Sequence, residues 1–218
     1  MTEQKAKVRT IKSQNSGLKF SISSFLLIIF CTFLIIISTF VQLNISHFTI
    51  PTNIFSGEEF RIYDYIHTFS LIPQVPAIMF IAALLGRKFG VTSVLIYILT
   101  GLFIIPVFAL GGGPKYVFEY GFGYILAYLP AVFITGTILK DGFTYKNIAK
   151  AVISGILTIH IFGILYMLVI AAFKHEGWMF TSGWIITQSG IKIIYDFIFS
   201  FIAVLCAKYL RLVLWLYM

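Results

Sequence analysis

Apolar residues occur along this chain in long runs that short polar segments separate. A bilayer core about 30 Å thick is crossed by roughly 20 apolar residues of helix, so runs of this length predict membrane-spanning helices. Six runs are found, at residues 22–43, 72–85, 91–109, 116–139, 148–173 and 184–210. The second is short and begins beside Pro73 and Pro76, which favour the first turn of a helix, so its helix is expected to start below the membrane surface. The pattern predicts an all-α integral membrane protein with six transmembrane helices.

Composition supports this fold class and excludes a cytosolic enzyme. Of the 218 residues, 59% are hydrophobic and 11% are charged, whereas charged residues make up about a quarter of a soluble domain. The formal charge of +8 would suit nucleic acid, but the basic residues lie at the ends of apolar runs, so we expect a bilayer as partner and no nucleic acid. Cys31 and Cys206 lie inside apolar runs without metal-ligand spacing, so neither a disulfide framework nor a metal site is predicted.

The basic residues predict the orientation, because Lys and Arg are enriched in cytoplasmic loops. With the N-terminus inside, twelve of the sixteen lie on the cytoplasmic side and Arg61, Lys115 and Lys174 lie outside, while Lys192 lies within the last run. The first run is too long for a signal peptide and lacks an A-x-A site, so an uncleaved helix is expected. We therefore expect a multi-pass protein of the plasma or inner membrane with both termini cytoplasmic.

This topology divides the chain into three parts. Residues 1–19 form a basic cytoplasmic tail, residues 20–212 a six-helix membrane domain with an outer loop at 44–71, and residues 213–218 a C-terminal end. Polar residues and glycines gather in the predicted outer half, whereas the predicted cytoplasmic loops are short and basic. Irregular backbone at membrane depth is tolerated where it lines protein or a wet cavity. The distribution suits a protein that receives a small polar ligand from outside.

Two ordered sequence blocks resemble one protein family. The first is Ile-Pro-Gln-Val-Pro at 72–76, followed by Phe-Ile-Ala-Ala-Leu-Leu-Gly-Arg-Lys-Phe-Gly at 80–90; the second is Pro-Val-Phe-Ala at 106–109, three glycines at 111–113 and Gly-Phe-Gly-Tyr-Ile-Leu-Ala-Tyr-Leu-Pro-Ala at 121–131. In this order they resemble BioY proteins, the biotin-binding subunits of energy-coupling-factor (ECF) transporters. The last helix departs from the family pattern of an Asp followed by a Lys, because Lys192 precedes Asp196 and Phe199 takes the later place.

The resemblance implies a function and partners. It implies high-affinity biotin uptake by the substrate-specific (S) component of an ATP-driven vitamin transporter, assembled with a transmembrane coupling subunit and cytoplasmic ATPase subunits. The sequence contains no G-x-x-x-x-G-K-[ST] phosphate loop, so the chain is not expected to be the ATPase. We expect no enzymatic activity and no cofactor, biotin being the transported ligand.

Candidate ligand residues follow from the outer polar cluster together with the resemblance. Biotin offers two N–H donors and a carbonyl on its ureido ring, an apolar body and a carboxylate. Aromatic rings near Tyr124 could cover the body, Asp196 could accept a ureido N–H, and Lys192 or Lys115 could meet the carboxylate. The predicted substrate-binding residues are Gln74, Gly111, Gly112, Gly113, Lys115, Tyr120, Tyr124, Lys192 and Asp196.

Structural interpretations of the same residues stay open. Lys192 and Asp196, four residues apart on one helix face, could neutralise one another, and the spacing of Lys115 and Glu119 favours a surface pair. The glycines could form only a tight turn. Gln74 could cap backbone groups freed by its neighbouring prolines, and Tyr124 could be an aromatic of the membrane interface. His160 lies within the fifth run with no titratable partner predicted beside it, which favours a hydrogen bond between helices.

Two alternative functions stay open beside transport of biotin. An S component for a different vitamin would share the fold, since the pocket varies on a common scaffold. An intramembrane enzyme is less consistent with the sequence: Tyr195-Asp196 has no second Asp in a Gly-x-Gly-Asp setting, and His175-Glu176 does not continue to a second His. On the first helix Ser24, Cys31 and Ser38 recur every seven residues, a stripe that suits either docking to a partner or packing inside this chain.

Overall fold

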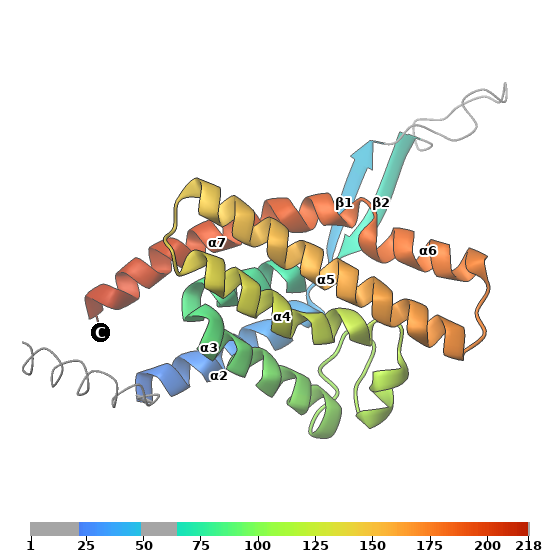
Figure 1. The fold of residues 1–218 in the computed structure, drawn as a ribbon, viewed down its shortest axis with the longest axis horizontal. Coiled ribbons are helices and arrows are strands. Elements are labelled where there is room, and N and C mark those ends of the chain that lie inside the picture. The colour runs from blue at the N-terminus through green and yellow to red at the C-terminus, as the bar shows by residue number, and fades with distance from the viewer. Residues whose placement is uncertain (1–21, 49–64, 218) are drawn as a thin grey trace, which may run out of the picture.

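The protein is a bundle of helices with a small two-stranded sheet at one end (Figure 1). The computed structural model describes residues 22–48 and 65–217; the basic tail and part of the outer loop lie outside this range. The helices are α2 (Ile22–Phe40), α3 (Gln74–Phe103), the 3₁₀ helix η2 (Pro114–Phe118), α4 (Phe122–Leu139), α5 (Tyr145–Phe173), α6 (Trp178–Ser189) and α7 (Lys192–Tyr217), and the strands are β1 (Leu43–Phe48) and β2 (Ile66–Leu71). The predicted class, a mostly helical membrane protein, is confirmed.

α3 folds back on itself as a helical hairpin. In a straight helix the 23 residues between Gln74 and Tyr97 would span about 35 Å, but the Gln74 side-chain amide donates to the Tyr97 hydroxyl at 2.8 Å. The reversal occurs at Gly86, whose φ of 70° and ψ of −176° interrupt the helix and favour glycine, which has no Cβ. The two arms lie at the second and third predicted spans and confirm both as helical, except that the third span ends at Phe103 and its predicted residues 104–109 are not helical.

The last predicted span, 184–210, is wrong as one continuous helix. It contains the end of α6 and the start of α7, with a break at residues 190–191. The backbone N–H of Gly190 closes α6 by donating to the Ile186 carbonyl at 2.9 Å, and a side chain at Gly190 would collide with that same carbonyl oxygen. Lys192 therefore lies in the first turn of α7 and not two turns inside a span. A break this short leaves the hydropathy of the segment almost unchanged.

The fourth predicted span begins six residues too early. Tyr116 belongs to the short helix η2, Glu119 has extended backbone, and α4 begins at Phe122. The predicted outer loop at 44–71 also contains secondary structure that the sequence reading missed. β1 and β2 pair antiparallel with Leu43 opposite Leu71, and Ser46 Oγ lies 2.7 Å from Thr68 Oγ1 across the ladder.

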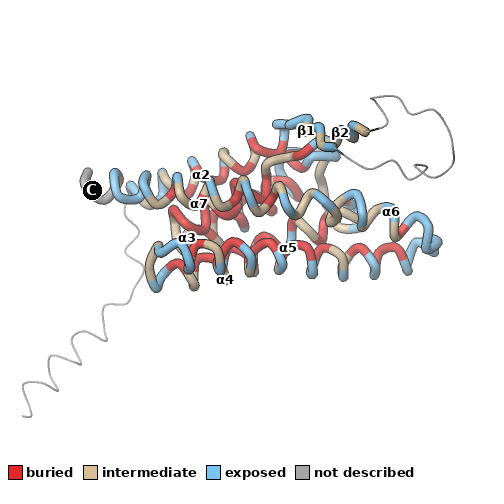
Figure 2. The backbone as a smooth tube through the Cα atoms, turned by 90° about the horizontal axis from the view of Figure 1, so that it is seen from above, coloured by how far each residue is buried: buried red, intermediate tan, exposed pale blue. Residues whose placement is uncertain are grey.

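The helices are buried toward the bundle interior and exposed outward (Figure 2). On α2, Ile28 and Ile35 are buried while Phe25, Phe30 and Phe33 are more than half exposed. A soluble protein would bury such outward-facing rings, whereas lipid solvates them. Among the described residues, five helical segments are long and apolar enough to cross a membrane: Ile22–Phe40, Gln74–Phe103, Phe122–Leu139, Tyr145–Phe173 and Trp178–Leu214.

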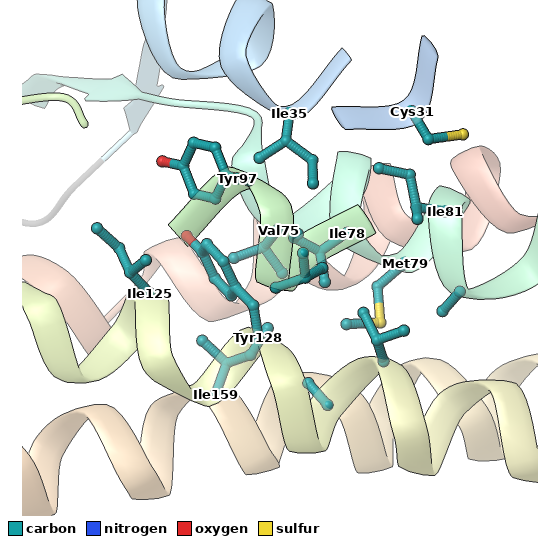
Figure 3. Close-up of a cluster of buried hydrophobic side chains, with 14 of the residues drawn as sticks. Cys31, Ile35, Val75, Ile78, Met79, Ile81, Tyr97, Ile125, Tyr128 and Ile159 are labelled. Atoms are coloured by element: carbon teal, nitrogen blue, oxygen red, sulfur yellow. The ribbon is translucent and has the colours of Figure 1, made fainter. Parts of the chain in front are cut away.

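The core joins both arms of α3 to α4 and α5 (Figure 3). Small residues bring the backbones together. A Cβ on Gly136 of α4 would lie 2.5 Å from the backbone nitrogen of Arg87, just after the α3 reversal. The same atom on Gly163 of α5 would lie 2.5 Å from the ring of Tyr124. The first approach holds the end of α4 against the α3 reversal, and the second holds the start of α4 against the middle of α5, where the candidate site lies.

Basic residues divide between the two ends of the bundle. The reversal of α3, the end of α4, the start of α5 and the end of α7 share one end (Figure 1), and they carry Arg87, Lys88, Lys140, Lys146, Lys150, Lys208 and Arg211. Lys115, Lys174 and Lys192 belong to elements at the other end. The described basic residues that were predicted to share the cytoplasmic side therefore do share one end of the bundle. Which end faces the cytoplasm stays a prediction.

Candidate functional site

A cavity of about 190 Å³ lies at the end of the bundle where α4 and α7 begin. It is enclosed by the start of α3, the loop before η2, the first half of α4, the middle of α5, and α6. Most of its wall is apolar or aromatic. The described lining residues are Ile72, Gln74, Val75, Ala109, Leu110, Tyr116, Gly121, Tyr124, Ile125, Tyr128, Ile159, His160, Trp184, Gln188 and Lys192.

Gln74 is the centre of a buried hydrogen-bond network. Its Nε2 donates to Thr39 Oγ1 at 2.6 Å and to the Tyr97 hydroxyl at 2.8 Å, and its Oε1 accepts from the Tyr128 hydroxyl at 3.0 Å. Tyr97 and Tyr128 lie close together beside Val75 (Figure 3). Both protons of the Gln74 amide are used inside the protein, so this residue ties α2, both arms of α3 and α4 together at the cavity wall.

A second network links α4, α5 and α6 beside the cavity. Ser189 Oγ, on the last residue of α6, lies 2.8 Å from the Tyr124 hydroxyl and 2.8 Å from His160 Nδ1. The rings of Tyr124 and His160 also meet edge to face with centroids 5.8 Å apart. Trp184 packs on the other side of Tyr124 at 5.8 Å. α6 is thus fastened over the cavity by one hydroxyl and one indole ring.

His160 has a titratable partner that the sequence reading did not foresee. Its Nε2 lies 3.6 Å from Asp196 Oδ2, and both side chains are buried. Lys192 makes no ion pair with a described carboxylate, so the interpretation that Lys192 neutralises Asp196 is wrong, and the expectation that His160 lacks a titratable partner is wrong too. The pairing depends on how α5 packs against α7, and no spacing within either helix encodes it.

This pair is incompletely satisfied. Within the described part of the chain, four buried atoms have no hydrogen-bond partner: His160 Nε2, both carboxylate oxygens of Asp196, and Ser200 Oγ. Buried polar atoms are normally paired, so the pair retains unused hydrogen-bonding capacity next to the cavity. His160 lines the cavity and Asp196 lies behind it. Asp196 therefore contacts His160, which lines the cavity, and does not line the cavity itself.

The three glycines build a turn and do not line the cavity. Phe108 and Gly111 exchange backbone hydrogen bonds of 2.9 and 3.0 Å, which turns the chain at Ala109 and Leu110 and brings those two residues to the cavity. Gly111 has φ of 127° and Gly113 φ of 88°, conformations that favour glycine. A Cβ on Gly112 would lie 2.5 Å from Pro106 Cα, so bulk there would displace backbone and would not test ligand contact alone.

Tyr120 and Lys115 lie outside the cavity. The Tyr120 hydroxyl donates to Glu176 Oε1 at 2.6 Å, and Lys174 Nζ lies 4.3 Å from the centre of its ring. The hydrogen bond to the Glu176 carboxylate raises the pKa of Tyr120 to about 12. Tyr120 also packs against Trp184 with ring centroids 6.1 Å apart, so it supports the cavity rim. Lys115 is exposed on η2.

The structure therefore brings together only part of the predicted set. Gln74, Tyr124 and Lys192 line the cavity, while the glycines, Lys115, Tyr120 and Asp196 do not. The cavity is also lined by three residues that were not among the predicted ones, Tyr128, Trp184 and Gln188. Tyr128 comes one helical turn after Tyr124 and could have been found from that spacing. The positions of Trp184 and Gln188 at the cavity could not be predicted, because the sequence predicts one continuous span where the structure has α6 and α7.

The protein is a helical membrane bundle with a mostly apolar cavity near one end. This architecture is typical of membrane proteins that bind a small ligand between their helices. The sequence pattern of the BioY family matches residues 9–214 of this chain. The chain belongs to the BioY family.

Two similar proteins add detail. The chain is 34% identical over 104 residues to a probable biotin transporter BioY of Lysinibacillus sphaericus, a match that covers 45% of this chain and 53% of that protein. The match thus spans about half the length of that curated relative. The fold is similar to a crystal structure of the S component for biotin from an ECF-type ABC transporter, with a TM-score of 0.64 and 21% identity over 87% of this chain and 91% of the other.

Proposed function

We propose that this protein is the biotin-specific S component of an ECF transporter and that it binds biotin in the cavity from the outer side of the membrane. Membership of the BioY family supports this function, as do the relative from Lysinibacillus sphaericus and the similar fold of a biotin S component. The observation that carries the proposal is the cavity itself, whose chemistry suits a compact, mostly apolar ligand with a few polar groups.

The cavity wall offers a complement to each part of biotin. The rings of Tyr124, Tyr128 and Trp184 and the side chains of Ile125 and Ile159 cover an apolar ring system. Gln188 offers both an amide donor and an acceptor to a ureido group. Lys192, which pairs with no described carboxylate, offers the cation that a carboxylate requires.

The partners follow from the same assignment. The chain would act as a transport subunit rather than an enzyme, with the work of uptake supplied by cytoplasmic ATPase subunits through a transmembrane coupling subunit. The basic end of the bundle, which includes Arg87 and Lys140, would face the cytoplasm. The cavity end would then open outward, in the plasma or inner membrane, where the vitamin arrives.

Titration calorimetry on the purified chain with a panel of vitamins tests this function. Biotin is expected to bind at one site per chain, and the other vitamins of the panel are expected not to bind. Trp184→Ala is expected to weaken biotin binding at least about tenfold, because a large aromatic wall is lost. Trp178→Ala is the matched control, since Trp178 lies on the same helix and is 77% exposed. Tight binding of another vitamin in place of biotin would overturn the assignment.

A further inference from the structure

A second hollow lies at the basic end of the bundle, away from the cavity. It is a groove of about 600 Å³ between the start of α2, the reversal of α3 and the end of α7, here called the α2–α7 groove. Its walls are mostly apolar and include Leu27 of α2, Leu84, Leu85 and Phe89 of α3, and Leu212 of α7. Because these helices face the bilayer, an apolar chain would suit the walls of this groove.

Two cations, Lys208 and Arg211, lie in the wall of this apolar groove. Arg211 donates one N–H to the Ala83 carbonyl at 3.4 Å and lies 5.7 Å from the ring centre of Phe143. Lys208 Nζ lies 5.7 Å from the ring centre of Tyr145. Neither side chain forms an ion pair with a described carboxylate, and a guanidinium has five N–H donors. Most of the hydrogen-bonding capacity of both cations is therefore unused within the described residues.

The surroundings increase the positive potential of the groove. Arg87 and Lys88 follow the α3 reversal that forms one wall, and Lys140 lies at the C-terminal end of α4. In the described residues of this end, Asp141 is the acidic counterpart. A ligand that enters the groove thus meets an apolar wall and a net positive charge, which together select an anionic amphiphile.

We propose that the α2–α7 groove binds one anionic phospholipid, with an acyl chain against the leucines and the phosphate at Lys208 and Arg211. Arginine holds phosphate through paired N–H donors and lysine through its point charge. Basic pockets between transmembrane helices are suited to anionic headgroups. The inference concerns a surface remote from the cavity and does not depend on which ligand the cavity takes.

The two cations of the groove explain the preference for an anionic headgroup, and its apolar walls explain the preference for a ligand with an acyl chain. Inorganic phosphate alone would leave the apolar wall unfilled, and a zwitterionic lipid would bring a choline cation toward an end that is already basic. An acidic helix of a partner protein shares part of this chemistry. It differs from lipid in that the purified chain would show no headgroup preference without the partner.

Native mass spectrometry of the full chain, released from detergent with added lipid, measures the bound species directly. The chain is titrated with phosphatidylglycerol and phosphatidylcholine of the same acyl composition, and separately with inorganic phosphate. The preference for phosphatidylglycerol is expected to be on the order of 25-fold at low salt, since each of the two cations contributes about a factor of five. Thermal unfolding in the same detergent is measured in parallel, and phosphatidylglycerol is expected to raise the midpoint.

Variants locate the site. Lys208→Gln with Arg211→Gln is expected to reduce the preference to about twofold, and Leu85→Trp, which fills the groove while keeping both cations, is expected to displace the lipid. Lys146→Gln with Lys150→Gln is the matched control, because both lysines are exposed at the same end and neither lines the groove; it is expected to keep the preference. Equal retention of the two lipids would overturn the proposal. So would a control variant that loses the preference as fully as the groove variant, or inorganic phosphate that stabilises the chain as much as the lipid does.

Discussion

His160 and Asp196 are buried ionisable residues in contact, and such residues are costly in an apolar interior unless they are paired. The cost predicts their response to substitution. His160→Phe leaves the Asp196 carboxylate buried without its partner and is expected to destabilise the protein by about 3–5 kcal/mol. Replacing both residues, His160→Phe with Asp196→Leu, is expected to recover most of that loss. Thermal unfolding in detergent, analysed as a double-mutant cycle, measures the coupling.

The matched control for this cycle is Ser154→Ala, on the same helix as His160 but outside its contacts. Ser154→Ala combined with Asp196→Leu is expected to give additive changes. If His160→Phe and Asp196→Leu are also additive, the two side chains are not coupled and the 3.6 Å separation has no energetic consequence.

Lys192 is expected to contribute to ligand affinity and little to stability. It lines the cavity and pairs with no described carboxylate, so its removal leaves no orphaned charge. Lys192→Met is expected to weaken the binding of biotin by about 1.5–3 kcal/mol, which lowers the affinity roughly ten- to a hundredfold. The methyl ester of biotin, which lacks the carboxylate charge, is expected to lose much less. Calorimetry with both ligands separates the charge effect from a general loss of binding.

Lys115→Met is the control for Lys192, because Lys115 carries the same charge at the same end of the bundle and is exposed outside the cavity. This variant is expected to bind biotin like the parent. A loss of affinity in Lys115→Met, with Lys192→Met unchanged, would move the carboxylate site to η2.

At the scale of elements, α6 is the α-helix with the fewest buried side chains among the described residues, since Thr181 is its one buried residue. It carries Trp184 and Gln188 to the cavity and is held at its end by Ser189. Ser189→Ala removes the hydroxyl shared by Tyr124 and His160, so α6 is expected to loosen, with faster hydrogen exchange along α6 and faster dissociation of ligand. Ser182→Ala is the control, because Ser182 lies on the same helix and its hydroxyl donates locally to the Met179 carbonyl at 3.2 Å. Equal exchange in both variants would show that Ser189 does not hold α6.

The elements differ in how far the sequence could predict them. Apolar length located the helical segments well, because a bilayer demands about twenty apolar residues whatever surrounds them. It could not locate the break at residues 190–191, since two residues barely change the hydropathy of a long run. The strands were missed because a strand of six residues such as Leu43–Phe48 carries only a brief alternation.

The site was less predictable than the fold for a physical reason. Gln74, Tyr124 and Lys192 are polar residues within or beside long apolar runs, and this local feature could be recognised in the sequence. The contact of His160 with Asp196 and the position of Trp184 over Tyr124 depend on packing between helices far apart in sequence. Glycines 111–113 were predicted to bind the ligand. They belong instead to a turn that places Ala109 and Leu110 at the cavity and leaves the glycines outside it.

For the whole molecule, the division of basic residues between the two ends predicts the orientation in the membrane. A reporter that is active only in the cytoplasm is expected to be active when fused after Met218. It is expected to be silent when inserted at Ser56, in a part of the outer loop outside the described residues. The reverse result would invert the topology and would place the cavity on the cytoplasmic side, where it could not receive a vitamin from outside.

The central claim is that the cavity holds biotin, and the ligand that the protein retains from the cell tests it most directly. The full chain is purified in mild detergent from cells grown with biotin, then denatured, and the released small molecules are identified and counted by mass spectrometry. Biotin is expected at close to one molecule per chain, and far less is expected from the Trp184→Ala variant purified in the same way. A different vitamin at one molecule per chain would contradict the account, and so would biotin in equal amount from the parent and the variant.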